Sequence, residues 1–523
     1  MKSPSRKVLA AFLIPGFLAA ASLLSQSREA RKEPASEPAR HGLPWYVAAS
    51  AIHRVALKPA TKYWRFEHLS LHEPEASAQL RAWKSEGIDA IEIFAPEEGG
   101  NSYDGLDAKS RFALDPGIGT MDDLRRLVKN AHSMGMRVVT FQNLGYAAID
   151  APQFTKAEDD VRAGRVSRET QFFYWSEKSD APPPAGGNSY FFVRPALPGY
   201  DPSKAEFWQW SDRAQRYYWT RWPGKDANGD TTHLPQYNWS SAAWPAEAAR
   251  VVRFWMDTGL DGMVIDAVNW YAGYDWAKNA ALIAELRGST GDKLLLPEGG
   301  GAFHSDDPVG WIRDGRWTAL YDYGLDIWWE RESRPMYQSI QNGDPALFEQ
   351  ALRSYHDRVV ASGGILVQPV LEFDDPGKQQ LGEALLATSG DMLCYCGTNE
   401  RAFRPAPGIG ALLKLKAHHP ALYQNSARRR IATSDDAHVY AALRYAADGS
   451  ERILSVVNFS AQSISVEIDT GAIHAGRYEN LESGESAVLT RTGLHLELPA
   501  YGHRIYRVTE SANDLRTIPE KAQ

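Results

Sequence analysis

The sequence has little cysteine, no excess of positive charge and a single long hydrophobic run. Only two of its 523 residues are cysteines, Cys394 and Cys396, so no disulfide framework holds the fold together. Lys and Arg number 57 against 65 Asp and Glu, and the net charge of −8 argues against a nucleic-acid partner. Hydrophobic residues at 43% and charged residues at 23% exclude global disorder and coiled-coil structure. A chain of this length forms two to four domains, or one large barrel with additions.

The long hydrophobic run lies near the N-terminus. Three basic residues precede an apolar stretch from Val8 to Leu24, which ends in small residues, as in a bacterial secretion signal. The stretch is just short of the roughly 20 apolar residues that a membrane helix needs. We expect residues 1–25 to be a signal peptide, with an uncleaved membrane anchor as the alternative, and residues 26–44 to be a linker. The protein is then periplasmic or secreted.

Aromatic residues, by contrast, are abundant, with 17 Trp, 23 Tyr and 18 Phe. Such side chains pack cores, and they also stack on the flat apolar faces of ligands, sugars included. Many of them lie in residues 145–245, a stretch also rich in Pro and Gly. A segment this long without regular alternation is usually functional or a small domain of its own. We therefore expect an inserted subdomain B at 145–245.

Strand-like and helix-like segments alternate on both sides of this insertion, over residues 45–144 and 246–420. Eight strand–helix units favour a (β/α)8 TIM barrel over a doubly wound sheet. Residues 421–510 contain short strands joined by polar turns and no helix pattern, which predicts an antiparallel β-sandwich, followed by a tail at 511–523. The barrel strands are predicted near 49–55, 89–94, 136–141, 262–268, 293–297, 319–323, 364–371 and 392–395.

Carboxylates stand where three of these strands end: Asp266 after the fourth, Glu298 after the fifth, and Asp374 with Asp375 after the seventh. Functional groups of such barrels lie at the carboxyl ends of the strands. A single carboxylate there is more simply a helix cap or a hydrogen-bond partner. Three that converge suit glycoside hydrolysis, in which one attacks the anomeric carbon, one protonates the leaving oxygen and one stabilises the cationic transition state.

Several ordered stretches also carry a family resemblance: Ser102–Gly105, Leu234–Asn238, Gly259–Ala267, Pro297–Gly299 and Leu371–Asp375. Through them the chain resembles the α-amylase family of glycoside hydrolases (family 13), α-glucosidase-like, from about residue 45 to 508. The resemblance implies a retaining enzyme with Asp266 as nucleophile, Glu298 as acid/base and Asp375 as transition-state stabiliser. It also implies that Tyr103 stacks under the sugar and that Asn238 belongs to the substrate site.

The polar neighbours of these carboxylates differ from the family pattern. The family's Arg two residues before the nucleophile is Val264 here, and Phe141 stands where the third strand supplies an Asp. We expect charge from loops, above all Arg401 and Arg404, to replace the missing Arg. Further positions where the family has polar sugar-binding residues carry other side chains, and we expect these to line an atypical sugar site: Tyr146, Trp270 and Asp374.

These observations predict an exported retaining α-glycosidase that hydrolyses α-linked oligosaccharides or glycosides. A noncatalytic carbohydrate-binding or membrane-anchored scaffold relative, or a transglycosylase, is the alternative. We expect no cofactor and no metal ligands, because Asp226–Asp230 has calcium-like composition but lacks the spacing of an EF-hand loop. Relatives often hold a structural calcium between barrel and insert, which is the alternative here. The sugar, the linkage and the oligomeric state stay open.

Overall fold

The computed structural model describes most of the chain between residues 43 and 509. The ranges are 43–58, 66–100, 105–182, 184, 207–225, 231–268, 271, 276–298, 309–313, 319–321, 335–396, 404–469, 477–488 and 494–509. The expected signal peptide, most of the expected linker and the expected tail lie outside these residues. Among the helices within the ranges, none combines the length and apolar character that crossing a membrane requires.

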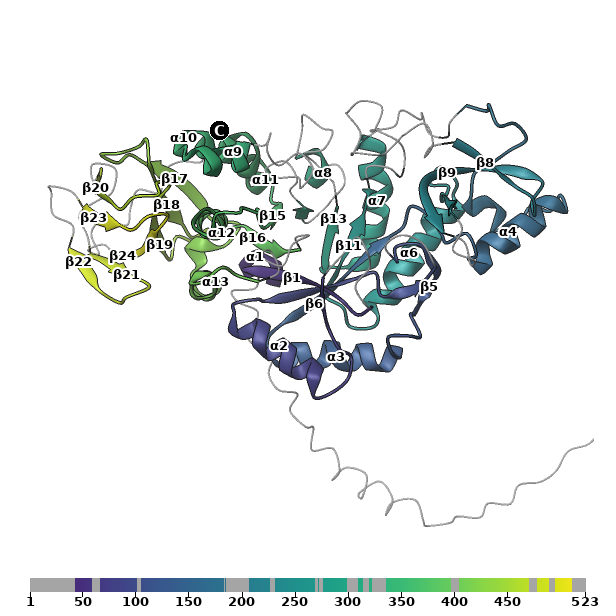
Figure 1. Ribbon diagram of the computed structural model, residues 1–523, viewed down its shortest axis with the longest axis horizontal. Coiled ribbons are helices and arrows are strands. Elements are labelled where there is room, and N and C mark those ends of the chain that lie inside the picture. Colours follow the sequence, from purple (N-terminus) through teal and green to yellow (C-terminus); the bar gives the residue numbers. More distant parts are fainter. Residues whose placement is uncertain are drawn as a thin grey trace, which may run out of the picture. The chain divides into compact units, whose positions relative to one another are not determined.

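Eight parallel strands confirm the (β/α)8 TIM barrel (Figure 1). They follow the order β13-β11-β6-β3-β1-β16-β15-β14, and the two ends of that order, β13 and β14, lie against each other. A short strand β2 (Glu67–His68) pairs with β1 outside this path. The barrel strands are β1 (Ala51–Ala56), β3 (Ala90–Phe94), β6 (Arg137–Asn143), β11 (Gly262–Asp266), β13 (Leu294–Pro297), β14 (Ala319–Tyr321), β15 (Ile365–Pro369) and β16 (Met392–Tyr395).

Side chains alternate along these strands between two hydrophobic cores. One core joins the strands to the surrounding helices, and it contains Val138, Met263 and Leu295. The other is made largely of the strand residues of opposite parity and therefore fills the barrel interior. It includes Phe141, Val264 and both cysteines, which are buried in this same core.

Helices lie between the barrel strands, and α3 begins at a capping box of Thr120 and Asp123. A π-helical turn η7 (Leu352–His356) divides the helical stretch from Pro345 to Ala361. Apolar spacing does not reveal this turn, in which buried His356 pairs with Asp391 at 3.0 Å. The helices are α1 (Trp45–Ala48), α2 (Glu75–Ser85), α3 (Met121–Ser133), α6 (Ala243–Met256), α7 (Trp276–Thr290), α8 (Gly310–Arg313), α9 (Pro335–Asn342), α10 (Pro345–Ala351), α11 (Asp357–Ala361), α12 (Pro376–Ser389) and α13 (Ile409–His418).

The inserted segment has secondary structure of its own, with helix α4 (Pro152–Arg162) and a four-stranded antiparallel sheet. Its aromatic side chains pack largely on one another, as in the stacked rings of Phe154 and Trp175. A small hairpin of β4 (Glu97–Gly99) and β5 (Ala108–Leu114) follows β3. The strands of the insert are β7 (Trp175–Ser176), β8 (Phe207–Ser211), β9 (Arg216–Lys225) and β10 (Thr231–Pro235).

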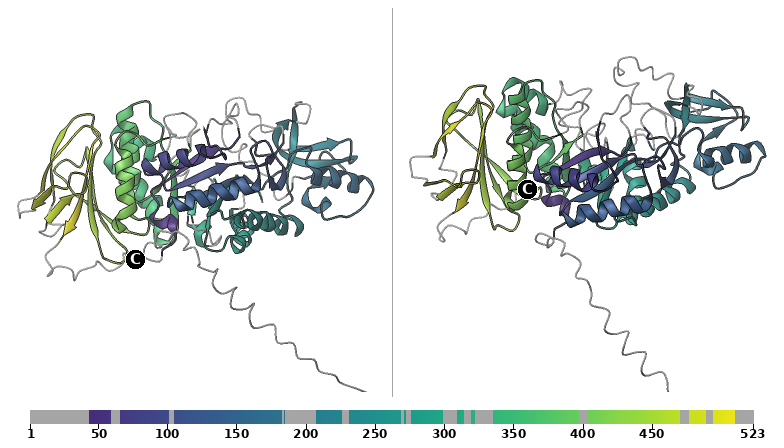
Figure 2. Two further views of the ribbon diagram at one scale, coloured as in Figure 1. Left: turned by 90° about the horizontal axis from the view of Figure 1, so that it is seen from below. Right: turned by 60° about the horizontal axis from the view of Figure 1, so that its bottom comes forward.

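The C-terminal strands form two antiparallel sheets that share one core, which confirms the β-sandwich. Helices α12 and α13 lie between these strands and the barrel strands (Figure 2), and α12 contacts both β16 and β19. The larger sheet contains β17 (Ala427–Ile431), β18 (Val439–Tyr445), β19 (Arg452–Asn458), β24 (His503–Thr509), β21 (Arg477–Asn480) and β22 (Ser486–Val488), and the smaller contains β20 (Ile464–Ile468) and β23 (Leu494–Leu498).

Candidate active site

Asp266 is the last residue of β11, a strand whose five residues are all buried. Asn143 ends the neighbouring strand β6 and stands opposite Asp266 in the parallel register. Its side-chain amide donates a hydrogen bond to Asp266 Oδ2. A buried carboxylate is tolerated when a hydrogen-bond donor satisfies it, so Asn143 both stabilises and orients this group.

Glu298 follows β13 directly and lies beside Asp266. Its backbone N–H donates to Ile265 O at 2.9 Å, and its Oε2 accepts from the Ala267 N–H at 3.4 Å. Ala267 has a φ of 49°, a left-handed conformation that is uncommon for a residue with a Cβ. This strained turn sits directly after Asp266 and is the point at which the backbone presents a donor to Glu298. The two carboxylates thus emerge from adjacent strand ends.

Tyr271 bonds the backbone at the same turn. Its hydroxyl donates to Asp266 O at 2.7 Å and accepts from the Leu144 N–H at 3.0 Å. Gly145 makes room for the ring, since a Cβ there would lie 2.9 Å from Tyr271 Cε1. Burial, followed by the negative charge of Asp266, raises the pKa of Tyr271 well above its usual value, with a smaller contribution from Glu298. The hydroxyl therefore stays protonated and remains a donor. The charges of both carboxylates contribute to its raised pKa.

Asp375, predicted to be the transition-state stabiliser, lies at the start of a helix. Asp375 is exposed and is the N-cap of α12, where its Oδ1 accepts from the backbone N–H groups of Gly377 at 2.7 Å and Lys378 at 3.2 Å. Its charge acts on Tyr501 of the C-terminal sandwich, whose pKa is raised by burial and then by Asp375. Asp374 is exposed as well. Asp375 thus caps α12, and its predicted role in the reaction stays a prediction.

Two other predicted substrate residues occupy buried or turn positions. Tyr146 is buried in the barrel-interior core, its ring centre is 6.4 Å from that of Trp222, and its backbone pairs with Gln236 of the insert. Asn238 closes a turn before α6, because its Oδ1 accepts from the N–H groups of Ser240 at 3.0 Å and Ser241 at 3.1 Å. Tyr146 thus lies at the junction of barrel and insert, while the side-chain oxygen of Asn238 serves local structure.

Arg404 does not replace the missing Arg at position 264. Its guanidinium bonds Glu67 Oε1 at 2.5 Å and Glu86 Oε1 at 2.8 Å. The side chain is 45% exposed, and Glu86 follows α2 on the helical side of the barrel. The sequence could not reveal this pairing, because its partners are more than 300 positions away. The remaining predicted site residues, Tyr103, Trp270 and Arg401, lie outside the described residues.

Sequence reasoning missed Asn143 because the third strand was predicted to end at Phe141. The strand runs to Asn143, and the alternation that places Phe141 in the barrel interior places Asn143 on the same face. Arg54 and Glu92 were missed too, although a charged residue within an apolar strand is itself a signal. Both are buried between β1 and β3.

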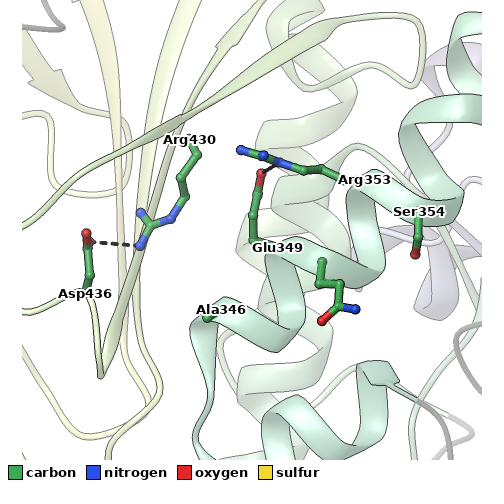
Figure 3. Close-up of a pocket in the computed structure, with 7 residues that line it drawn as sticks. Ala346, Glu349, Arg353, Ser354, Arg430 and Asp436 are labelled. Atoms are coloured by element: carbon green, nitrogen blue, oxygen red, sulfur yellow. Dashed lines mark hydrogen bonds and ion pairs between the residues drawn. The ribbon is translucent and has the colours of Figure 1, made fainter.

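A cavity of about 590 Å³ lies elsewhere, between α10, η7 and the start of the C-terminal sandwich (Figure 3). Its charged groups pair with one another, Arg353 with Glu349 and Arg430 with Asp436 at 3.0 Å. The carboxylate pair contributes nothing to its walls. These walls are formed by Ala346, Glu349, Gln350, Arg353, Ser354, Arg430 and Asp436.

The alternative of a structural calcium ion concerns the boundary of barrel and insert. Within the part of the chain that the structure describes, no three His, Cys, Asp or Glu side chains cluster in a way that could hold a metal ion. The calcium-like stretch 226–230 lies outside that part. The expectation of no metal thus stays an expectation.

Comparison with known proteins gives matches of two kinds. The family model "Alpha amylase, catalytic domain" matches residues 84–291. A trehalose-6-phosphate hydrolase of Escherichia coli is 27% identical over 183 residues, and an α-glucosidase of Schizosaccharomyces pombe is 27% identical over 195 residues. These matches cover 35% and 36% of this chain, and each spans only 29% of the relative's own length.

The solved structures extend the likeness of the fold to almost the whole chain. A trehalulose synthase superposes with a TM-score of 0.63 at 16% identity, covering 90% of this chain and 100% of the other. The Eubacterium rectale protein Amy13B superposes with a TM-score of 0.64 at 13% identity, covering 90% and 98%. At such identity the likeness concerns the fold alone.

Proposed function

We propose that this chain, which matches the α-amylase catalytic-domain model and resembles α-glucosidases, is an exported retaining α-glycosidase. Its substrates are α-linked oligosaccharides or glycosides. The proposal is carried by one observation: Asp266 and Glu298 lie side by side at adjacent strand ends, linked through the turn at Ala267.

In the proposed reaction Asp266 attacks the anomeric carbon while Glu298 donates its proton to the leaving oxygen, so the glycosidic bond breaks as a glycosyl ester forms. Glu298 then takes a proton from water, which attacks the ester and releases the sugar. Asn143 holds the attacking carboxylate, and the strained turn holds Glu298 through the Ala267 N–H. This two-carboxylate chemistry needs no cofactor. We assign no step to Asp375, which caps α12.

The sugar site is proposed to be atypical. Val264 and Phe141 face the barrel interior where the resemblance implies polar groups. Stacking and apolar contact then replace part of the hydrogen bonding to the sugar at the cleavage position. The residues before position 43 are proposed to direct the protein to the periplasm or the medium.

A screen of aryl α-glycosides and α-linked oligosaccharides, with Asp266→Asn as the control, tests this function. Asn keeps the shape of the side chain but cannot form the ester, so turnover is lost in that variant. Turnover that survives in Asp266→Asn argues against the assigned nucleophile. Sugar binding without turnover supports the noncatalytic alternative.

Product analysis with added acceptor sugars separates hydrolysis from transglycosylation. A hydrolase releases free sugar at the rate at which the aglycone appears, whereas a transglycosylase transfers the glycosyl group to the acceptor. Retention is read from the anomer first formed, before mutarotation, by NMR.

A further inference from the structure

Arg54 and Glu92 form an ion pair inside the barrel, with 4% and 0% of their surfaces exposed. They stand opposite each other in the β1–β3 register, and Arg54 Nε donates to Glu92 Oε1. Burying two charges costs several kcal/mol per ion, and hydrophobic residues of similar volume are often at least as stable. Stability alone therefore does not explain this pair.

The pair lies beneath the carboxylates at the strand ends. The guanidinium carbon of Arg54 is 4.3 Å from the ring centre of Phe141. Phe141 stands opposite Val264 in the β6–β11 register and precedes Asn143 by two residues. Two residues along a strand span about 6.6 Å. The cation thus occupies the interior layer directly below the hydrogen bond between Asn143 and Asp266.

Glu92 couples electrostatically to the site above it. Burial raises the pKa of Glu92, Arg54 opposes this, and the charge of Glu298 raises it further. Among the described residues, buried Glu92 Oε2 finds no hydrogen-bond partner. A negative Glu298 thus disfavours the charged form of Glu92, which links the ion pair to the strand-end carboxylates.

We propose that Arg54, held between Glu92 and Phe141, is a positioning residue that supplies positive charge beneath Asp266 and Glu298. Its charge balances the negative charge that Asp266 carries before attack, in an interior where Val264 offers none. This inference rests on the proposed function. Arg54 touches the ring of Phe141 and not the substrate, so it acts through the carboxylates and affects kcat rather than binding.

The test removes the pair as a unit, because removing Arg54 alone leaves Glu92 buried and uncompensated, which is strongly destabilising. The double variant Arg54→Met/Glu92→Leu keeps the volume and removes both charges. Arg54→Lys keeps the charge. Arg428→Met is the control. The side chain of Arg428 is only 6% exposed, and it pairs with Asp357 at 2.7 Å and Glu349 at 2.6 Å, at the junction of barrel and sandwich.

We expect the double variant to fold and to lose kcat about 100-fold, with KM changed less than about threefold. Arg54→Lys keeps more activity than the double variant, and Arg428→Met loses thermal stability but keeps kcat. A double variant with kcat within about threefold of wild type overturns the inference while the proposed function stands. Wild-type protein without turnover on any α-glycoside overturns both. If the double variant does not fold, Arg54→Gln/Glu92→Gln, which retains a hydrogen bond across the pair, replaces it with the same two outcomes.

Discussion

The ends of β11 and β13 and the end of β15 carry the same local pattern, an apolar strand followed by carboxylates, yet their carboxylates differ in position. Asp266 is the last strand residue and Glu298 is the first after its strand, so both stay at the barrel mouth. Asp375 comes six residues after β15 ends at Pro369 and directly before Pro376, at the start of α12. The number of residues from the strand end thus differs between the carboxylate pair and the helix-capping Asp375.

The largest expected effect is on the Glu298 side of this comparison. Glu298→Gln cannot donate or accept the transferred proton, so kcat on an unactivated α-glycoside is expected to fall about 10²- to 10⁴-fold. Aryl glycosides with good leaving groups need less protonation, and their glycosylation step is affected less. Steady-state kinetics on both substrate types measures this. Equal losses on both would argue against Glu298 as the acid.

Glu383 extends the comparison to a third kind of carboxyl. It belongs to α12 and is buried against β16. It accepts from Tyr395 Oη at 2.8 Å and Gln379 Nε2 at 2.9 Å, yet burial dominates and raises its pKa to about 7. The folded state then binds more protons than the unfolded state between about pH 4.5 and 7. The contribution of Glu383 to the unfolding free energy is therefore fully present below about pH 4.5 and falls by about 3 kcal/mol as pH rises through that window.

Denaturant unfolding at pH 5 and pH 8 measures this contribution. Glu383→Gln does not titrate, so its unfolding free energy is expected to lack that part of the pH dependence. Its kcat at a given pH is expected to stay near the wild-type value. A variant with the full wild-type pH dependence of stability would contradict this account of Glu383.

A smaller effect is expected at Asn143, which distinguishes the Asp266 strand end from that of Asp375. Asn143→Ala removes a hydrogen bond to a charged group, of the kind that contributes about 1.5–3 kcal/mol, or roughly 10- to 100-fold in rate. The loss is expected mainly in kcat. Asn238→Ala is the matched control, because it removes an asparagine whose described acceptor contacts lie in a local turn.

The smallest effect is expected at Asp375. Asp375→Ala removes a helix cap, so the free energy of unfolding falls by about 1 kcal/mol while kcat is preserved. Asp375→Asn, which retains capping, is expected to match wild type in both measurements. A loss of kcat above about 100-fold in Asp375→Asn would restore Asp375 to the active site and break the comparison drawn here.

Much of the fold followed from local patterns. Strand β16 was predicted to the residue, because alternation depends on near neighbours. The pair of Asp266 and Glu298 was predicted for the same reason, since both stand where apolar strands end. Asn143 was missed by a two-residue error in one strand boundary, the least secure part of any such prediction.

Local sequence patterns did not predict contacts between residues that are distant in the chain. Arg404 was assigned to the site by its sequence neighbourhood, but its partners Glu67 and Glu86 come from the other end of the barrel sequence. Arg54 was overlooked, although β1 and β6 place it over Phe141 inside the barrel. Each case depends on which strands and helices become neighbours, a property that no local window contains.

The sequence alone determined the barrel, the insert, the sandwich and two carboxylates at strand ends, because periodicity and turn residues act over a few positions. Only the tertiary structure decided which charges meet. Register placed Asn143 against Asp266 and Arg54 against Glu92, and the start of α12 took Asp375 as its cap. The reason is physical: burial and pairing set the free energy of a charge, and both depend on residues far away in the chain.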